Sequence, residues 1–384
     1  MILGIDASRA NVGQKTGVEW YAWRIIQELK AIIPSHVQVV LYSREPLEGA
    51  LSALPPSWES RVIKTPFNRL WTQAGLSYEM YRNPPDLLFV PAHVMPLIHP
   101  RAIVTMHDIA SVRHPHAYSL LGRWYGNWSM QFALKHAFRV ITPSRFTAQE
   151  IQDVFGGALR RKHGMAGLEV IHLGSDATVA LSGENAASFI NRIPDDPYIL
   201  HIGRLERKKG TVDLIRAFEI IKEDPEHERL RLVLVGRPGY GYREVEQLIA
   251  ASAYREHIHR VGWLPEAEKQ QFLRGAFLFV FPSQYEGFGI PLLEAAACGV
   301  PVVARAAGSL PEIAGPDLVR WFYESHMLSP VLKEALRDSA WHAYVKMQGP
   351  RHATRFSWRA SAMRTWDVLR RALPQDVVAR SPDT

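Results

Sequence analysis

Two glutamates, Glu286 and Glu294, stand in the stretch SQYEGFGIPLLEAAACGVPVVA (283–304), separated by seven residues. A glycine-rich turn follows the first glutamate, and Pro291 pre-sets the first turn of a predicted helix that ends near residue 299. Glu286 is therefore expected before the helix and Glu294 about one turn inside it, so the two cannot bind the same atom. Two carboxylates along one edge suit two ligand regions rich in hydroxyl groups. A solvated helix face would explain Glu294 alone, but it explains the pair poorly.

The first amides of this predicted helix form a second chemical feature. They belong to Phe288, Gly289 and Ile290. They point out of a helix N-terminus, where the helix favours negative charge. An anion is therefore expected beside the two carboxylates.

A basic loop, HIGRLERKKG (201–210), lies between a predicted strand and a predicted helix. The strand ends at Gly203, and Arg204 and Lys209 follow it in the loop. Cations next to a helix N-terminus suit a diphosphate. A solvated basic turn is an equally good interpretation of this loop taken alone.

Two loops in the first half of the chain also follow predicted strands. The segment NVGQKTGVEWY (11–21) contains Gly13 and Gly17, which allow close approach of a ligand to the backbone, although a plain turn explains them as well. The segment VTMHDIASVRHP (104–115) places His107 just after a strand. A histidine there can hydrogen-bond a sugar or phosphate or relay a proton, and it can also be structural.

Short apolar runs alternate with amphipathic segments along the whole chain. The runs are apolar on both faces, as parallel strands buried under helices are. This alternation predicts an α/β fold of doubly wound parallel sheets, which bind ligands at the carboxyl ends of their strands. The predicted strands lie in residues 2–8, 37–43, 86–92, 102–108, 139–144, 168–174, 198–203, 231–236, 277–283 and 300–304.

The series of strands is interrupted by a polar, proline-closed stretch at about 175–197. It predicts a linker at 181–197 between two Rossmann-like domains. The first domain covers 1–180, and the second covers 198–362. Two such domains facing each other would form a cleft.

Composition narrows the class of protein. The chain has 384 residues, 47% of them hydrophobic, and a net charge of +7, which suits phosphates, anionic lipid or nucleic acid but also mere solubility. Its one cysteine, Cys298, rules out an internal disulfide framework and fits the cytoplasm. No signal peptide and no membrane-spanning run is expected.

Together the quoted motifs resemble the retaining glycosyltransferases of family 4. The stretch at 283–304 resembles the E-x7-E motif of that family, and GRLERKKG, TMHDIA, VITPSRFTAQEI, FSWRASA (356–362) and the segment 261–283 also match it. The resemblance implies the GT-B fold, with two Rossmann-like domains facing a central cleft. It also implies a C-terminal helix, at about 363–384, that crosses back onto the N-terminal domain. The loops at 11–17 and 315–325 depart from the family pattern.

The resemblance implies catalytic roles for Glu286, His107, Arg204 and Lys209. Glu286 and His107 would contact the donor sugar, and Arg204 and Lys209 would hold the departing diphosphate. Glu294 would bind both ribose hydroxyls of the nucleotide.

A wider set of residues would bind the donor around this centre. The resemblance implies no metal site, because arginine, lysine and a helix dipole take the place of a metal in this family. It implies no cofactor either, and the donor substrate would be a nucleotide-diphosphate sugar, GDP- or UDP-linked. The donor-binding residues implied by the resemblance are Glu294, Gly17, Gly13, Phe288, Gly289, Ile290, Gly203, Gly262, Trp263 and Leu264.

The predicted function is a metal-independent, retaining hexosyltransferase of polysaccharide biosynthesis. It would move mannose or another hexose from the nucleotide sugar to a lipid-linked or polysaccharide acceptor. A GT-B sugar-nucleotide epimerase and a non-catalytic nucleotide-sugar-binding scaffold are the alternatives. A nicotinamide dehydrogenase is disfavoured because the fingerprint glycines are missing, and nucleic acid because the basic residues form no continuous stripe.

A membrane contact is left open by the sequence. Trp124, Tyr125 and Trp128 lie near Arg123, and ALRRKHG occupies 158–164. These residues suit a protein surface that contacts the inner face of an anionic membrane peripherally. Aromatic residues in the core and basic residues in solvent explain the pattern equally well.

Overall fold

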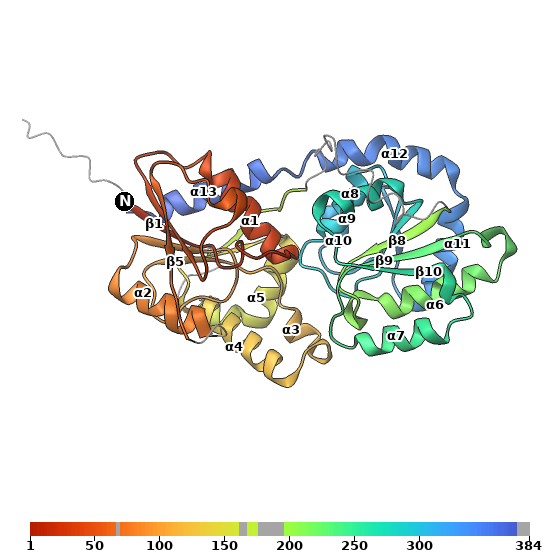
Figure 1. Ribbon diagram of the computed structural model, residues 1–384, viewed down its shortest axis with the longest axis horizontal. Helices are drawn as coiled ribbons and strands as arrows, with labels where there is room; N and C mark the ends of the chain where they lie inside the picture. Colours follow the sequence, from red (N-terminus) through yellow and green to blue (C-terminus); the bar gives the residue numbers. More distant parts are fainter. Residues whose placement is uncertain (67–69, 161–166, 176–195, 375–384) are drawn as a thin grey trace, which may run out of the picture.

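The computed structural model describes residues 1–66, 70–160, 167–175 and 196–374. Two parallel sheets form two lobes that lie side by side along the long axis of the molecule (Figure 1). The first sheet has seven strands in the order β3-β2-β1-β4-β5-β6-β7, and the second has six in the order β10-β9-β8-β11-β12-β13. In each sheet the strand order reverses once, beside β1 and beside β8, which is the doubly wound arrangement. The predicted fold class is confirmed.

The strands of the first sheet are short. They are β1 (Ile2–Asp6), β2 (Gln38–Ser43), β3 (Trp58–Val62), β4 (Leu87–Val90), β5 (Ala102–Thr105), β6 (Arg139–Thr142) and β7 (Leu168–Val170). The second sheet contains β8 (Tyr198–Ile202), β9 (Arg231–Val235), β10 (Ile258–Gly262), β11 (Leu278–Phe281), β12 (Val302–Arg305) and β13 (Val319–Phe322).

Three strands, β3, β10 and β13, were not expected from the sequence. Each is the outermost strand at one edge of its sheet. Their sequences, WESRV, IHRVG and VRWF, contain charged residues that remain partly exposed. An edge strand has a neighbouring strand on one side only, and its side chains are less completely buried than those of a central strand. These three strands therefore lack the continuous apolar run by which a central strand is recognised in the sequence.

Helices cover both faces of each sheet. In the first lobe they are α1 (Gly17–Lys30), α2 (Ser77–Arg82), α3 (Ala110–Arg113), α4 (Leu120–His136) and α5 (Arg145–Arg160). In the second lobe they are α6 (Thr211–Lys222), α7 (Tyr242–Ala251), α8 (Glu266–Gly275), α9 (Ile290–Ala297), α10 (Leu310–Ile313), α11 (Leu328–Arg337) and α12 (Ser339–Ala353). A last helix, α13 (Trp358–Ala372), returns to the first lobe.

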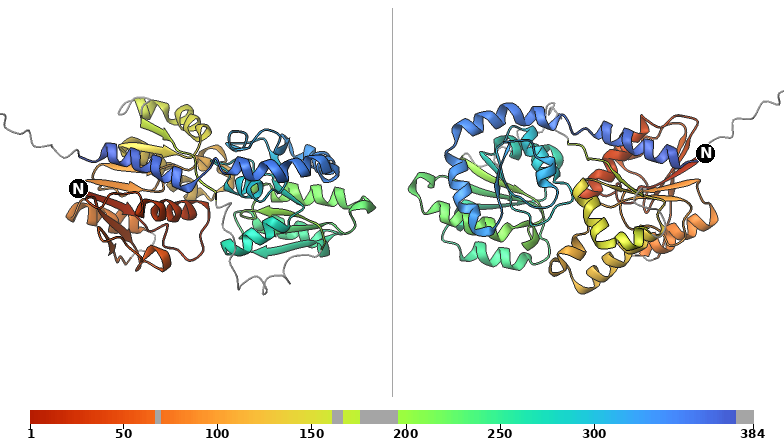
Figure 2. Two further views of the ribbon diagram at one scale, coloured as in Figure 1. Left: turned by 90° about the horizontal axis from the view of Figure 1, so that it is seen from above. Right: turned by 180° about the vertical axis from the view of Figure 1, so that it is seen from behind.

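The return of α13 links the two lobes. It packs against α1 in one apolar cluster that also includes Phe288 and Leu293 of the second lobe. Figure 2 shows α12 along the second lobe and α13 over the first. The helix begins at Trp358, before the expected start at 363, and the amide of Ser175 donates to Phe356 O at 3.2 Å beside it. Residues 375–384 of the expected helix and 181–195 of the expected linker lie outside the described residues.

Candidate active site

A cavity of about 610 Å³ lies between the two lobes, at the carboxyl ends of strands from both sheets. All the predicted site residues except Gly262 line it. Those that line it are Gly13, Gly17, His107, Gly203, Arg204, Lys209, Trp263, Leu264, Glu286, Phe288, Gly289, Ile290 and Glu294. Residues distant in sequence thus meet where doubly wound sheets place their ligands.

The basic loop and the first glutamate meet directly. Lys209 ends a short 3₁₀ turn (Arg207–Lys209), and its Nζ donates to Glu286 Oε1 at 2.6 Å. Arg204 is half exposed, with its Nε 3.6 Å from Glu206 Oε2. The ion pair with Lys209 fixes the Glu286 carboxylate at the cavity wall. The half-exposed guanidinium of Arg204 is accessible to a ligand.

The second glutamate has a partner that the sequence did not predict. Glu294 is 1% exposed, and Lys269 Nζ of α8 donates to its Oε1 at 2.7 Å. Lys269 also lies 2.8 Å from Glu266 Oε2. Burial lowers the pKa of Lys269, but the two carboxylates outweigh burial and leave that pKa above its ordinary value. Glu294 is therefore a buried carboxyl group in direct contact with a cation.

The N-terminus of α9 opens into the cavity between the two glutamates. Gly289 has φ of 100°, a left-handed conformation that favours glycine, and it is the N-cap of this helix. Phe288 is buried in the cluster shared by the two lobes, which fixes the turn in place. The free amides of this helix end can bind an anion.

The first lobe contributes a histidine to the opposite wall. The Nε2–H of His107 donates to Pro91 O at 3.2 Å, and Tyr21 contacts the ring edge-on at 4.7 Å. Burial lowers the pKa of His107, so the imidazole is neutral at pH 7. Its Nδ1 is then the acceptor of the ring.

The loop before α1 forms part of the cavity wall on the side of the first lobe. Neither Gly13 nor Gly17 has any atom within 4 Å of the place where a Cβ would stand, so the space beside both is open. Lys15, a lining residue that was not predicted, donates from Nζ to Val12 O at 2.7 Å. Trp263 Nε1 donates to Lys15 O at 3.3 Å and so links the two lobes above the cavity.

Gly262 has a different place from the one expected. It ends β10 with φ of 81°, and its carbonyl accepts from the amide of Gly236 at 2.8 Å. It shapes the turn that presents Trp263 and Leu264 to the cavity, and it does not line the cavity itself.

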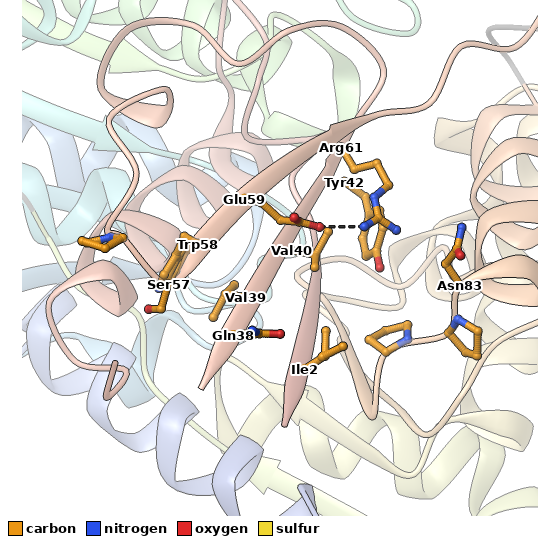
Figure 3. A pocket seen from close by; sticks show the side chains of 13 residues that line it. Ile2, Gln38, Val39, Val40, Tyr42, Ser57, Trp58, Glu59, Arg61 and Asn83 are labelled. Carbon is orange, nitrogen blue, oxygen red and sulfur yellow. Dashed lines mark hydrogen bonds and ion pairs between the residues drawn. The ribbon is translucent and has the colours of Figure 1, made fainter. Parts of the chain in front are cut away.

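A second hollow, of about 550 Å³, lies along β2 and β3 and reaches Ile2 at the start of β1 (Figure 3). It contains the ion pair of Arg61 and Glu59, at 2.6 Å, and none of the predicted site residues. Within the described residues, a group of side chains able to hold a metal occurs at Asp224, Glu226 and His227. It lies away from the cavity, and Arg337 pairs with both of its carboxylates.

Two protein-family models match consecutive parts of the chain. The model described as Glycosyltransferase Family 4 matches residues 15–178, and that described as Glycosyl transferases group 1 matches 184–349. The O-antigen chain mannosyltransferase B of Escherichia coli is 28% identical over 281 residues, covering 69% of this chain and 69% of that protein.

Solved structures share the fold over nearly the whole chain. Sucrose-phosphate synthase from Thermosynechococcus elongatus has a TM-score of 0.74 at 20% identity, covering 97% of this chain and 98% of that one. Anabaena Alr3699/HepE in complex with UDP-glucose has a TM-score of 0.69 at 20% identity, covering 96% and 99%. The chain belongs to the family 4 type of glycosyltransferases with the GT-B fold. The epimerase and scaffold alternatives are not favoured by these matches.

Proposed function

We propose that this glycosyltransferase moves a hexose from a nucleoside-diphosphate sugar to a lipid-linked or polysaccharide acceptor, with retention and without a metal. The observation that carries the proposal is the cavity in which two glutamates, two cations and a helix N-terminus meet. Mannose is the first donor sugar to test, because a mannosyltransferase is among the relatives. A nucleotide donor is supported by the UDP-glucose complex of a protein with the same fold.

The diphosphate would lie between Arg204, Lys209 and the first amides of α9. These groups are fixed before the reaction, so they stabilise the negative charge that develops on the leaving group. Glu294 would accept hydrogen bonds from the two ribose hydroxyls, and the hydrogen bond from Lys269 Nζ fixes the position of its carboxyl group for that task. Glu286 would contact hydroxyls of the sugar.

Retention would proceed on the face of the sugar that carries the diphosphate. The acceptor hydroxyl would approach that face and pass its proton to a diphosphate oxygen as the glycosidic bond forms and the bond to the diphosphate breaks. His107 would accept a hydrogen bond from a sugar hydroxyl through Nδ1. The protein would then act mainly by positioning and by charge stabilisation.

A thermal-shift titration with GDP, UDP, ADP and their hexose conjugates, in the presence of a chelator, tests the donor. A ligand at 100 times its dissociation constant adds about 2.7 kcal/mol to the free energy of unfolding. One nucleotide should stabilise the wild type selectively, and Glu294→Gln should lose that effect. Product anomers read by NMR then decide between retention and inversion. Stabilisation by no nucleotide would contradict the proposed function.

We also propose a cytoplasmic location with peripheral contact to an anionic membrane. In the described part of the chain, no helix combines the length and the apolar character that a bilayer crossing requires. Leu120, Leu121 and Trp124 at the start of α4 are 84%, 81% and 67% exposed, beside the exposed Arg123. Tyr125 and Trp128 are only half-buried, and Trp124 stacks on Trp128 at 6.5 Å. Exposed apolar side chains next to cations suit a lipid interface.

Sedimentation with vesicles tests this contact. Wild type should sediment with vesicles that contain phosphatidylglycerol at low salt and less so with neutral vesicles. The double variant Leu121→Ser, Trp124→Ser should remain in solution, whereas Tyr323→Ser, at an exposed site of the second lobe, should behave as wild type. Equal sedimentation of all three proteins would contradict the membrane surface.

A further inference from the structure

Lys208, the middle residue of the basic turn, has an unusual position. It is 8% exposed and lines the cavity. Its neighbours in the turn have carboxylate partners: Arg207 lies 2.5 Å from Glu244, and Lys209 lies 2.6 Å from Glu286. Among the described residues, no carboxylate lies within ion-pair distance of Lys208. Its Nζ donates instead to the hydroxyl of Tyr118, at 3.0 Å, across the gap between the lobes.

Lys208 is thus a buried lysine that, within the described part of the chain, has no carboxylate in direct contact. The ammonium also lies 5.1 Å from the centre of the Tyr118 ring, which offers a weak cation–π contact. A hydroxyl and a ring face compensate only part of the cost of removing an ammonium from water. The other deeply placed lysine of the cavity, Lys269, has two carboxylates. A ligand that brings negative charge to Lys208 would complete the site.

The position of Tyr118 indicates which substrate would bring a negative charge to Lys208. Tyr118 precedes α4 in the first lobe, whereas the diphosphate groups Arg204 and Lys209 belong to the second. Asp108 lines the same wall, and its carboxylate accepts from the amide of Ala110 at 2.9 Å. Lys208 therefore faces the lobe expected to bind the acceptor.

We propose that Lys208 and Tyr118 form a subsite for a negatively charged group, a phosphate or a carboxylate, on the acceptor. This inference rests on the proposed transferase function and adds the chemical class of the acceptor. Burial raises the pKa of Tyr118, so its hydroxyl stays protonated and can donate to the anion beside the ammonium. The hydrogen bond between the two side chains would open to admit the ligand.

Calorimetric titration of two small anions tests the subsite. The diphosphate site is first saturated with the nucleotide that the thermal-shift screen selects, and methyl phosphate or glucuronate is then titrated. At least one should bind the wild type. Lys208→Gln should weaken that binding about tenfold or more, because a hydrogen bond to a charged group is lost. Lys208→Arg should retain most of it, and Arg207→Gln, one residue away but outside the cavity, should match wild type. The two probes distinguish a phosphate-bearing acceptor from an acidic sugar.

Three outcomes would overturn the proposal: neither anion binds the nucleotide-saturated protein, Lys208→Gln binds like wild type, or Lys208→Gln loses nucleotide binding to the same extent. The last result would assign Lys208 to the diphosphate. Nucleotide binding is measured first in the same samples, so a protein that binds nucleotide but no second anion refutes the subsite alone. A protein that binds no nucleotide refutes the proposed function. In that case methyl phosphate is titrated into the nucleotide-free wild type and Lys208→Gln proteins, and equal binding by the two refutes the subsite as well.

Discussion

Lys269 and Glu294 form a buried ion pair at the base of the cavity, with Nζ 2.7 Å from Oε1 and side chains 15% and 1% exposed. The sequence alone suggests a solvated charge for Lys269, whereas it predicts a ligand-binding role for Glu294. Their contact joins α8 to α9 and orients the carboxylate toward the space where a ribose would lie.

Lys269→Met should be strongly destabilising. It leaves the Glu294 carboxylate buried without this cation, which costs about 3–5 kcal/mol. Glu294→Gln should cost less, because Lys269 keeps Glu266 as a partner. Both variants should lose nucleotide binding. Urea unfolding and nucleotide titration measure the two effects, and equal stability losses for both variants would contradict the argument.

His201 should make the free energy of unfolding depend on pH. This residue is fully buried on β8, and burial lowers its pKa to about 4, below the ordinary 6.5. Between these two values the unfolded chain binds a proton that the folded protein does not. The free energy of unfolding should therefore fall as the pH drops from 6.5 toward 4, by about 3 kcal/mol from this residue.

Replacing the ring tests that slope. His201→Phe should flatten this part of the curve relative to wild type, even if it lowers the stability at pH 7 by removing the hydrogen bond to Val280 O. His36→Phe is the control, because His36 is exposed to water. Parallel pH curves for His201→Phe and wild type would show that another group controls the acid limb.

Gly287 should tolerate no side chain. A Cβ there would collide with the carbonyl of His107 in the other lobe. The carbonyl of Gly287 accepts from Ser144 Oγ at 2.7 Å and from Thr147 Oγ1 at 3.1 Å, so the glycine cannot move away without loss. Gly287→Ala should lower kcat/KM at least about tenfold and the stability by about 1–3 kcal/mol. Gly156→Ala, in α5 with open space around it, should leave kcat/KM unchanged and raise the stability by up to about 1 kcal/mol.

The fold was predicted from the sequence, and all but one of the predicted site residues line the cavity, for a common reason. Central strands of doubly wound sheets are apolar on both faces, and residues such as Glu286 and His107 follow them directly in the chain. The carboxyl ends of such strands converge, so their loops meet without further information. Three of the four edge strands, β3, β10 and β13, lack such a run and were missed, whereas the fourth, β7, was predicted at 168–174.

The contacts that complete the site depend on distances between elements. Lys269 lies in the polar segment EAEKQQ of α8, where nothing local distinguishes it from a solvent-facing lysine. The pairing of Lys208 with Tyr118 joins residues 90 apart and from different lobes. Such contacts depend on how the helices pack and on how the two lobes are placed. The hydrophobic periodicity of the sequence does not predict either.

Glu312 should hold the two lobes together. From α10 in the second lobe, its carboxylate accepts from the amides of Arg145 and Phe146, at 2.9 and 3.0 Å, and from His172 Nε2 at 2.9 Å. It therefore caps the N-terminus of α5 in the other lobe, where a negative charge is favoured. Glu312→Ala should destabilise the protein by about 1–2 kcal/mol and loosen the contact between the lobes.

Small-angle scattering and kinetics measure this effect together. Glu312→Ala should increase the radius of gyration and lower kcat/KM, whereas Glu334→Ala, at an exposed position of α11, should change neither. Burial alone would raise the pKa of Glu312, but His172 and the two amides outweigh it and hold that pKa below 4.5. The contribution of Glu312 to stability is therefore fully present above pH 4.5 and is lost as the pH falls through the lowered pKa. A radius of gyration that expands already at pH 6 would mean that another group controls the contact.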